Sequence, residues 1–346
     1  MFSFETDSRS SALAGTTCSP STPPSGESPI LSGDETPVRT PPCVPRYAAQ
    51  LAPTPLVPVV QDDVTVWCKL EFLNPSGSTK DRIARYILDK AWRRGELNTG
   101  TTVIEASSGS TSIAFALACA QMGLRFVAVM PEGVSHERTL IIRAFGGEVR
   151  LTPKEGGIRG AIAETERLAA ECGGFLPRQF ANPDNAEAHR LTTAREILDQ
   201  MPGHAVDAVV SGVGTGGTLV GMWQGFREQG CRCLPVLARP VDTGDRFDAE
   251  CCSFSGRIPG VADALSRIFA EAKFDRLRTI EVRADDAIAT ARRLIAAGFP
   301  VGPSSGLNVE AAKAIARELG PDARVVTVFP DRMERYFSTE LFGRGS

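Results

Sequence analysis

Runs of β-branched residues alternate with stretches of helical periodicity from about residue 47 onwards, and few folds accept such an order. The runs predict strands at 64–72, 101–106, 125–131, 148–153, 207–212 and 324–330. The periodic stretches predict helices at 80–94, 111–122, 136–145, 158–171, 185–201 and 217–229. Strands and helices in this order form parallel sheets with helices on both faces. The sequence therefore predicts an α/β fold.

Three strand-to-helix turns have unusual compositions. They read NPSGSTKD at 74–81, EASSGSTS at 105–112 and SGVGTGGTLVG at 211–221. In an open α/β sheet, ligands bind at the carboxyl ends of the strands, where such turns gather. These turns are therefore where a ligand site is expected.

The turn at 211–221 has the composition of a phosphate site. Its glycines would let the backbone approach a ligand: Gly212, Gly214, Gly216 and Gly217. A helix that starts near Gly217 would direct N–H groups at an anion, and Thr215 and Thr218 would add hydroxyl donors. The spacing matches neither a dinucleotide-binding fingerprint nor a Walker loop. A tight turn without a ligand is the alternative interpretation.

The turn at 105–112 opens a helix with hydroxyl and amide donors that suit a carboxylate. The donors belong to Ser107, Ser108, Gly109, Ser110 and Thr111. The alternative is simple capping of the helix by Ser110 or Thr111.

Lys80 stands where the turn at 74–81 becomes a helix. The Ser78 hydroxyl is predicted to cap this helix, with Asp81 completing a capping box. The positive end of the helix dipole would then disfavour a protonated Lys80 amine, and a neutral lysine is what Schiff-base chemistry requires. A solvated surface lysine is the alternative. Together, a phosphate site, a carboxylate site and this lysine indicate a pyridoxal-phosphate enzyme that acts on an amino acid.

The segment NPSGSTKDR resembles the lysine motif of the cysteine synthase (O-acetylserine sulfhydrylase) and cystathionine β-synthase family, which are pyridoxal-phosphate enzymes of fold type II. The likeness extends from about residue 50 to 342, in the family's order. It continues through MPEGVSHERTLIIRAFGGEVRLTP, GIRGAIAETERLAAE, RQFANPDNAEAHRLTTAREI, GVGTGGTLVG, GPSSG and FPDRMERYFSTELF.

The resemblance implies two doubly wound parallel-sheet lobes, similar to the β subunit of tryptophan synthase, in a homodimer. The synthase domain would span 47–342, with a smaller mobile lobe at about 82–180. The larger cofactor lobe would combine 47–81 with 181–342.

The resemblance also implies a role for each site residue. Lys80 would form the Schiff base with pyridoxal 5′-phosphate and later move the α-proton. The cofactor phosphate would bind at Gly214, Thr215, Gly216, Gly217 and Thr218. Ser304 would face the pyridine nitrogen, and a neutral hydroxyl there favours β-chemistry over transamination. The substrate carboxylate would bind at Ser107, Ser108, Gly109, Thr111 and Gln179 and drive closure of the smaller lobe.

The implied reaction is β-replacement through an aminoacrylate, in which an activated serine loses its leaving group and a thiol or sulfide adds. Two segments depart from the family pattern. Ser110 and Ser112 replace the usual Asn and Gly of the carboxylate loop, where the Asn would touch the 3′ oxygen of the cofactor. The segment at 255–269 replaces an Ile-Gly-Ala-Gly-Phe-Ile-Pro type sequence and includes Asp263.

Three other functions stay open. A similar EASSGST loop occurs in proteins that resemble cysteine desulfhydrases, which release sulfide and pyruvate from cysteine. Serine/threonine dehydratases share the fold but have a four-glycine phosphate loop and an Asn-His carboxylate loop, which differ from the loops here. A catalytically silent partner-binding homologue is disfavoured by Lys80 and the intact phosphate loop.

Composition supports a small-molecule enzyme in a reducing compartment. Residues 1–46 are rich in Ser, Thr and Pro and predict a disordered arm, in which Glu5 and Asp7 are atypical of a signal peptide. A net charge of −3 without a basic run gives no basis for binding nucleic acid or a membrane. The nine scattered cysteines fit reduced thiols, so a cytoplasmic location is expected.

No metal is expected. The cysteine pairs 231/233 and 251/252 could in principle hold one, but their spacings are not those of a zinc site.

Overall fold

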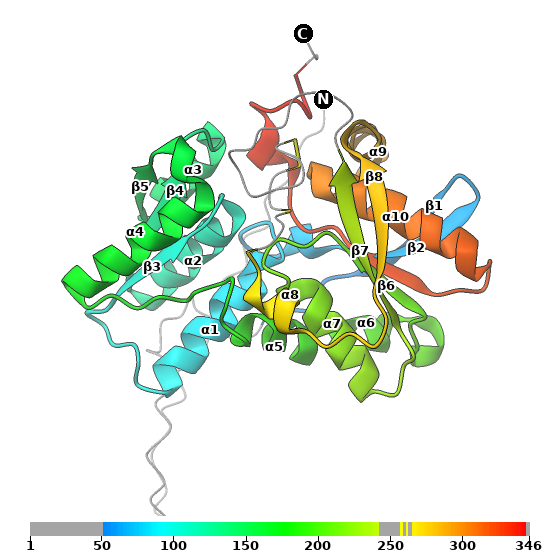
Figure 1. The fold of residues 1–346 in the computed structure, drawn as a ribbon, viewed down its shortest axis with the longest axis horizontal. Helices are drawn as coiled ribbons and strands as arrows, with labels where there is room; N and C mark the ends of the chain where they lie inside the picture. The colour runs from blue at the N-terminus through cyan, green and yellow to red at the C-terminus, as the bar shows by residue number, and fades with distance from the viewer. Residues whose placement is uncertain (1–50, 242–256, 259–260, 262–264, 344–346) are drawn as a thin grey trace, which may run out of the picture. The chain divides into compact units, whose positions relative to one another are not determined.

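The computed structural model describes residues 51–241, 257–258, 261 and 265–343 (Figure 1). The strands are β1 (Leu56–Gln61), β2 (Val64–Lys69), β3 (Thr102–Ala106), β4 (Arg125–Pro131), β5 (Glu148–Thr152), β6 (Ala208–Ser211), β7 (Leu234–Val241), β8 (Arg278–Arg283) and β9 (Val325–Val328). The α-helices are α1 (Lys80–Arg93), α2 (Ser110–Met122), α3 (His136–Ala144), α4 (Gly157–Cys172), α5 (Asp184–Leu191), α6 (Thr193–Gln200), α7 (Gly217–Glu228), α8 (Arg267–Glu271), α9 (Ala284–Ala296) and α10 (Pro303–Leu319). The 3-10 helices are η1 (Glu71–Leu73), η2 (Lys154–Gly156), η3 (Pro202–His204) and η4 (Met333–Tyr336).

The larger sheet has the strand order β1-β2-β9-β6-β7-β8. Its strands pair in parallel except β1, which pairs antiparallel with β2. The two strands are joined by Asp62 and Asp63, which both have positive φ angles, 52° and 59°. A two-residue turn of this kind forms a hairpin and is too short for the crossover that parallel strands need. The prediction of parallel sheets is therefore confirmed for the α/β class and wrong at this edge.

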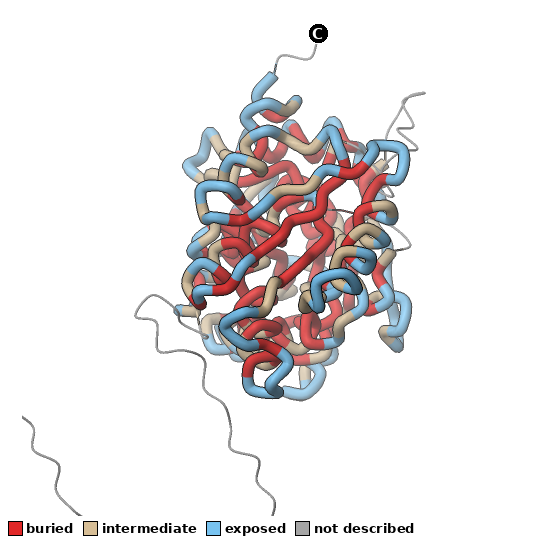
Figure 2. The backbone as a smooth tube through the Cα atoms, turned by 90° about the vertical axis from the view of Figure 1, so that its left-hand side faces the viewer, coloured by how far each residue is buried: buried red, intermediate tan, exposed pale blue. Residues whose placement is uncertain are grey.

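Helices cover both faces of the larger sheet. Ala208 and Val210 of β6 belong to a core cluster with residues of α10, whereas Val209 packs in a second cluster with residues of α6 and α7. Successive side chains of a strand point to opposite faces, so both faces are buried. Figure 2 shows buried residues along the strands and exposed residues in the loops that join the elements. This is the doubly wound arrangement that the sequence predicts.

The smaller sheet has the order β3-β4-β5, with both pairings parallel. Val103 and Ala128 pack with residues of α1 and α2 on one face, while Ile104 and Val127 pack with α4 on the other. The sheet and helices α2 to α4 lie within the span predicted for the smaller lobe. The lobe boundaries themselves stay a prediction.

Helix α1 carries the predicted lysine at its first position. Its apolar side chains at 83, 84, 87, 88 and 91 are buried, which is the i, i+3, i+4 spacing of one helix face. Asp81 in the first turn and Lys90 and Arg93 in the last turn complement the helix dipole.

Several elements differ from the expected ones. The helix expected at 185–201 is two helices, α5 and α6, which meet at Thr192 with φ −118° and ψ −72°. Strands β1, β7 and β8 and helices α8, α9 and α10 were not predicted. Gly306 lies inside α10, where a Cβ atom would stand 1.9 Å from the Ala287 carbonyl oxygen. The glycine is therefore present for close packing of α10 on α9.

Among the residues placed by the structure, no helix is long and apolar enough to cross a membrane. The same residues contain no group of three or more His, Cys, Asp or Glu side chains arranged to hold a metal. The predicted arm at 1–46, Asp263, and Cys251 and Cys252 lie outside the described residues.

Candidate active site

One cavity of about 300 Å³ collects the three turns singled out in the sequence. Of the predicted site residues, it is lined by Lys80, Ser107, Ser108, Ser110, Thr111, Gln179, Gly214, Thr215, Gly216, Thr218 and Ser304. Gly109 and Gly217 are their chain neighbours and do not line the cavity themselves. The cavity lies at the carboxyl ends of β3 and β6, as expected for an open α/β sheet.

Lys80 lies at the N-terminus of α1 and faces this cavity. Burial lowers the pKa of its amine, and the Asp331 and Glu71 carboxylates oppose that shift. Desolvation and the helix dipole both disfavour the ammonium form. The amine is thus closer to losing its proton than a surface lysine would be.

The predicted capping box does not form, because the N-cap of α1 is Thr79 and no side chain caps the helix from that position. The Ser78 hydroxyl accepts a hydrogen bond from the Lys80 backbone N–H at 3.3 Å. The Asp81 carboxylate, however, accepts from the Ser76 backbone N–H at 3.1 Å and from the Ser76 hydroxyl. Gly77, with φ +81°, turns the chain so that Ser76 lies over the start of the helix. Asp81 therefore braces the turn that precedes Lys80.

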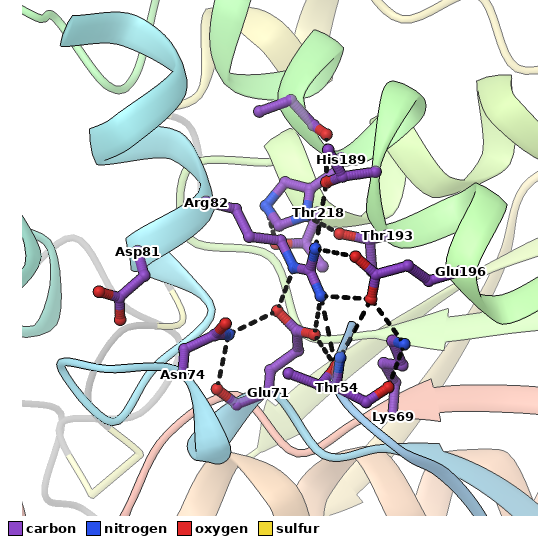
Figure 3. A network of polar contacts seen from close by, with 12 residues as sticks. Thr54, Lys69, Glu71, Asn74, Asp81, Arg82, His189, Thr193, Glu196 and Thr218 are labelled. Carbon is purple, nitrogen blue, oxygen red and sulfur yellow. Dashed lines mark hydrogen bonds and ion pairs between the residues drawn. The ribbon is translucent and has the colours of Figure 1, made fainter. Parts of the chain in front are cut away.

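A buried network of charges holds the first turn of α1 (Figure 3). Arg82 Nε lies 2.6 Å from Glu71 Oε2, and Arg82 Nη1 lies 2.6 Å from Glu196 Oε1 of α6. Lys69 Nζ of β2 lies 2.8 Å from Glu196 Oε2. The network ties α1 to β2, η1 and α6, two residues after Lys80. Sequence reasoning missed it, although two charged residues at the end of an apolar strand, Lys69 and Glu71, were a signal.

The glycine-rich turn forms the start of α7. Gly216 has φ +79°, and a Cβ atom on Gly217 would stand 1.8 Å from Asn185 Oδ1, so both positions require glycine. Asn185 donates to the Thr215 hydroxyl at 3.0 Å. The first N–H groups of a helix have no partners inside the helix, so this turn offers donors to an anion.

His189 contacts this turn through Thr218 (Figure 3). Its Nε2 lies 3.2 Å from the Thr218 hydroxyl, and its Nδ1 lies 2.9 Å from the Thr193 hydroxyl. Burial lowers the pKa of His189 to about 3, so the ring is neutral and orients Thr218 without adding a charge.

The serine-rich turn is not capped by either predicted side chain. The N-cap of α2 is Gly109, and neither Ser110 nor Thr111 caps the helix, so that alternative is wrong. The Thr111 hydroxyl donates to Gln179 Oε1 at 2.6 Å, and Gln179 Nε2 donates to the Ala106 carbonyl oxygen at 2.6 Å. These contacts join Gln179 to the turn across 68 residues of sequence.

A buried carboxylate supports the same turn. Glu105 accepts hydrogen bonds from the backbone N–H groups of Ala106 at 2.9 Å and Gln179 at 3.1 Å. Burial nevertheless raises its pKa to about 8.

Ser110 has a partner that sequence reasoning missed. Its hydroxyl donates to Asp331 Oδ2 at 3.0 Å, and the Tyr336 hydroxyl donates to the same oxygen at 2.7 Å. Both Asp331 and Tyr336 line the cavity. The serine that replaces the family's Asn is therefore bonded to a carboxylate.

Ser304 lies in the first turn of α10, is 8% exposed and faces the cavity. Asn308, one turn later, accepts from the Gly212 N–H at 2.8 Å and donates to the Val328 carbonyl oxygen at 2.9 Å. Helix α10 is thus held against the glycine-rich turn.

Residues 48–331 match the model of a family described as pyridoxal-phosphate dependent enzyme. Cysteine synthase B of Campylobacter jejuni is 38% identical over 291 residues, which cover 84% of this chain and 95% of that protein. A hydrogen sulfide-producing enzyme from Fusobacterium nucleatum has a TM-score of 0.76 at 34% identity, over 85% of this chain and 90% of that one. A mutant of that enzyme has been solved with an α-aminoacrylate intermediate. An O-acetylserine dependent cystathionine β-synthase from Helicobacter pylori has a TM-score of 0.74 at 32% identity, over 84% and 96% of the two chains.

Proposed function

This chain belongs to the family of pyridoxal-phosphate dependent enzymes, and from that premise we propose that it catalyses β-replacement on an activated serine of the O-acetylserine type. The product is cysteine or a related β-substituted amino acid. The observation that carries the proposal is that Lys80, the start of α2 and the start of α7 line one cavity. The similarity to cysteine synthases and to an O-acetylserine dependent synthase supports the substrate class.

The residues present fit pyridoxal phosphate. Lys80, with its lowered pKa, suits covalent attachment of an aldehyde. The phosphate would bind at the start of α7, at Gly214, Thr215, Gly216, Gly217 and Thr218. Ser304 would face the pyridine nitrogen, and Ser110 would lie near the 3′ oxygen. When bound, the cofactor supplies the electron sink that makes a proton on the substrate's α-carbon removable.

The substrate carboxylate binds at the start of α2. Its donors are Ser107, Ser108, Gly109, Thr111 and Gln179. The Thr111–Gln179 hydrogen bond holds two of these donors together before substrate arrives. Carboxylate binding there draws the smaller lobe, at about 82–180, over the site and excludes water.

Lys80 Nζ takes the α-proton once the substrate occupies the site, and the β-substituent then leaves. A thiol or sulfide adds at the β-carbon, and Lys80 returns the proton to the α-carbon. Ser304 presents a neutral hydroxyl where a carboxylate would keep the pyridine nitrogen protonated, which favours β-chemistry over transamination.

Cysteine desulfhydrase activity is the second candidate. The Ser110 hydroxyl donates its one proton to Asp331, so it has no proton left to donate to a ligand, whereas an Asn side chain has two N–H donors. The similarity to a hydrogen sulfide-producing enzyme also favours this candidate. A silent homologue is a weaker third candidate, because Lys80 and the phosphate turn are present.

We propose that the enzyme is a cytoplasmic homodimer. The family resemblance supports the dimer. The five cysteines with described surroundings, at 68, 119, 172, 231 and 233, are free thiols, which fits a reducing compartment.

A titration of the purified holoenzyme tests the proposed function. O-acetylserine and, separately, cysteine are added while the visible absorbance of the lysine-bound cofactor is followed and sulfide is assayed. A lasting spectral change with O-acetylserine that added sulfide reverses supports β-replacement. Release of sulfide and pyruvate from cysteine, without a lasting change, supports the desulfhydrase instead. No response to either amino acid, matching a Lys80→Ala control, contradicts both.

A further inference from the structure

Arg138 of α3 is a buried cation that the mechanism above does not use. The residue is 5% exposed and lines the cavity. Within the described ranges, no carboxylate lies within 4.0 Å of its guanidinium, and its buried Nε has no hydrogen-bond partner. Its position is held by a hydrogen bond of 2.8 Å from the Ser135 hydroxyl, at the start of α3, to the Arg335 carbonyl oxygen.

Gly109 and Tyr336 pack against the Arg138 side chain at the wall of the cavity. A Cβ atom on Gly109 would stand 2.1 Å from Arg138 Cδ, so the carboxylate turn leaves room for this side chain. The guanidinium carbon lies 5.0 Å from the centre of the Tyr336 ring. The Tyr336 and Ser110 hydroxyls both donate to Asp331 Oδ2, whereas Asp331 Oδ1 is buried without a hydrogen-bond partner in the described part of the chain and forms no ion pair with Arg138.

A buried guanidinium without a counterion is costly, and the face of one tyrosine ring compensates only part of that cost. The planar fork of an arginine matches a carboxylate in geometry and charge. The cavity wall thus contains a buried cation whose geometry suits a carboxylate.

This cation is separate from the donors assigned to the substrate's α-carboxylate. Gln179 is anchored at Thr111 and Ala106, whereas Arg138 lies against Gly109 and Tyr336. Sulfide, the simplest nucleophile, has no carboxylate for such a fork.

We propose that Arg138 binds a second carboxylate, carried into the site by the incoming thiol or released there as the acid of the leaving group. The inference rests on the proposed β-replacement and names the substrate class of the same site: thiols that carry a carboxylate. Arg138 thereby selects among nucleophiles, while the α-carboxylate stays with the turn at the start of α2.

The test compares holoenzymes of the wild type, Arg138→Met and Arg138→Lys. Arg143→Met, at an exposed position of the same helix, is the matched control. Mercaptoacetate and 2-mercaptoethanol serve as acceptor thiols with and without a carboxylate. Calorimetric binding of propionate to the resting holoenzyme provides a readout that does not need turnover.

In Arg138→Met we expect the KM for mercaptoacetate to rise roughly 30-fold or more, because a buried charge pair is lost. The KM for 2-mercaptoethanol should change little, Arg138→Lys should fall between, and Arg143→Met should match the wild type. If instead Arg138→Met selectively weakens product inhibition by acetate, the leaving group is the source of the carboxylate.

The proposal is overturned if the KM of each thiol, the inhibition by acetate and the affinity for propionate are the same in the wild type, Arg138→Lys and Arg138→Met. If Arg138→Met does not fold, Arg138→Lys decides, because it keeps the charge and loses the fork. If the wild type catalyses no replacement, the proposed function fails. In that case, propionate that binds the wild type and not Arg138→Met would still support a carboxylate site at Arg138. If propionate does not bind the wild type, the proposed carboxylate site is overturned.

Discussion

Substitution of Glu196 by Gln removes the anion that Lys69 and Arg82 share while keeping the shape of the side chain. Lys69 is fully buried and Glu196 is 12% exposed, so water cannot replace the lost charge. The one amide oxygen that remains can accept from only one of Lys69 and Arg82, and the amide NH2 then faces the other cation. Lys69 Nζ keeps the Thr54 carbonyl oxygen as a further acceptor. Arg82 would keep Glu71.

Removing one partner of a buried ion pair costs about 3–5 kcal/mol, because the other charge stays buried and uncompensated. Arg82 keeps a second carboxylate, so we expect the lower end of that range, about 3 kcal/mol at pH 7. For a domain of this size, that loss corresponds to a fall in Tm of roughly 6–12 °C.

The pH dependence follows from Lys69. Burial lowers its pKa below 10.5, and Glu196 opposes that shift, so Glu196→Gln lowers the pKa further. A lysine whose pKa is depressed in the folded state destabilises the fold fully below that depressed pKa, and the cost is lost as the pH rises from there to the unfolded value. The destabilisation by Glu196→Gln is therefore expected to shrink as the pH rises toward 10.5, the unperturbed lysine value.

Equilibrium unfolding in urea, followed by tryptophan fluorescence, measures the loss. Glu228→Gln is the matched control, because its ion pair with Arg190 is 47% exposed on the glutamate side and is expected to contribute under about 1 kcal/mol. The double variant Lys69→Met with Glu196→Gln should recover part of the loss, since it leaves no unpaired lysine. A Glu196→Gln variant as stable as Glu228→Gln would refute the reasoning.

Three further predictions concern the site. Gly217→Ala places a Cβ atom 1.8 Å from Asn185 Oδ1 and should weaken cofactor binding in a fluorescence titration, whereas Gly160→Ala, with open space around it, should leave binding unchanged. His189 has a pKa of about 3 against an unperturbed 6.5, so its own contribution to stability should fall by about 2 kcal/mol between pH 7 and pH 5, and urea unfolding at both pH values should show a change in the wild type that is less favourable by about this amount than the change in His189→Gln. Ser110→Asn should raise the ratio of replacement to sulfide release in a paired product assay. An unchanged ratio would show that Ser110 does not determine which of the two reactions occurs.

Features that depend on short stretches of chain were predicted well. The start of α1 at Lys80 and the start of α7 at Gly217 were both expected from turn composition, because glycine conformation and helix signals act over a few residues. The α/β class followed from the alternation of strands and helices for the same reason.

Local reasoning failed where several partners compete for one group. Asp81 was expected to bond its own helix start, but the bend at Gly77 placed Ser76 within its reach. The edge strand β8 has mostly exposed or half-buried residues, so it lacks the apolar run by which a buried strand is recognised.

The partners of the reactive groups depend on contacts between residues far apart in the chain. Ser110 meets Asp331 across 221 residues, and Arg82 meets Glu196 across 114. Arg138 is an ordinary helix residue in the sequence, and only packing against Gly109 and Tyr336 makes it a buried cation facing the cavity. Composition and periodicity show which side chains and turns a chain contains, so they predicted the lysine and the two turns that line the cavity. Burial and pairing are set when distant segments pack together, so the charge balance of the site appears only in the folded chain.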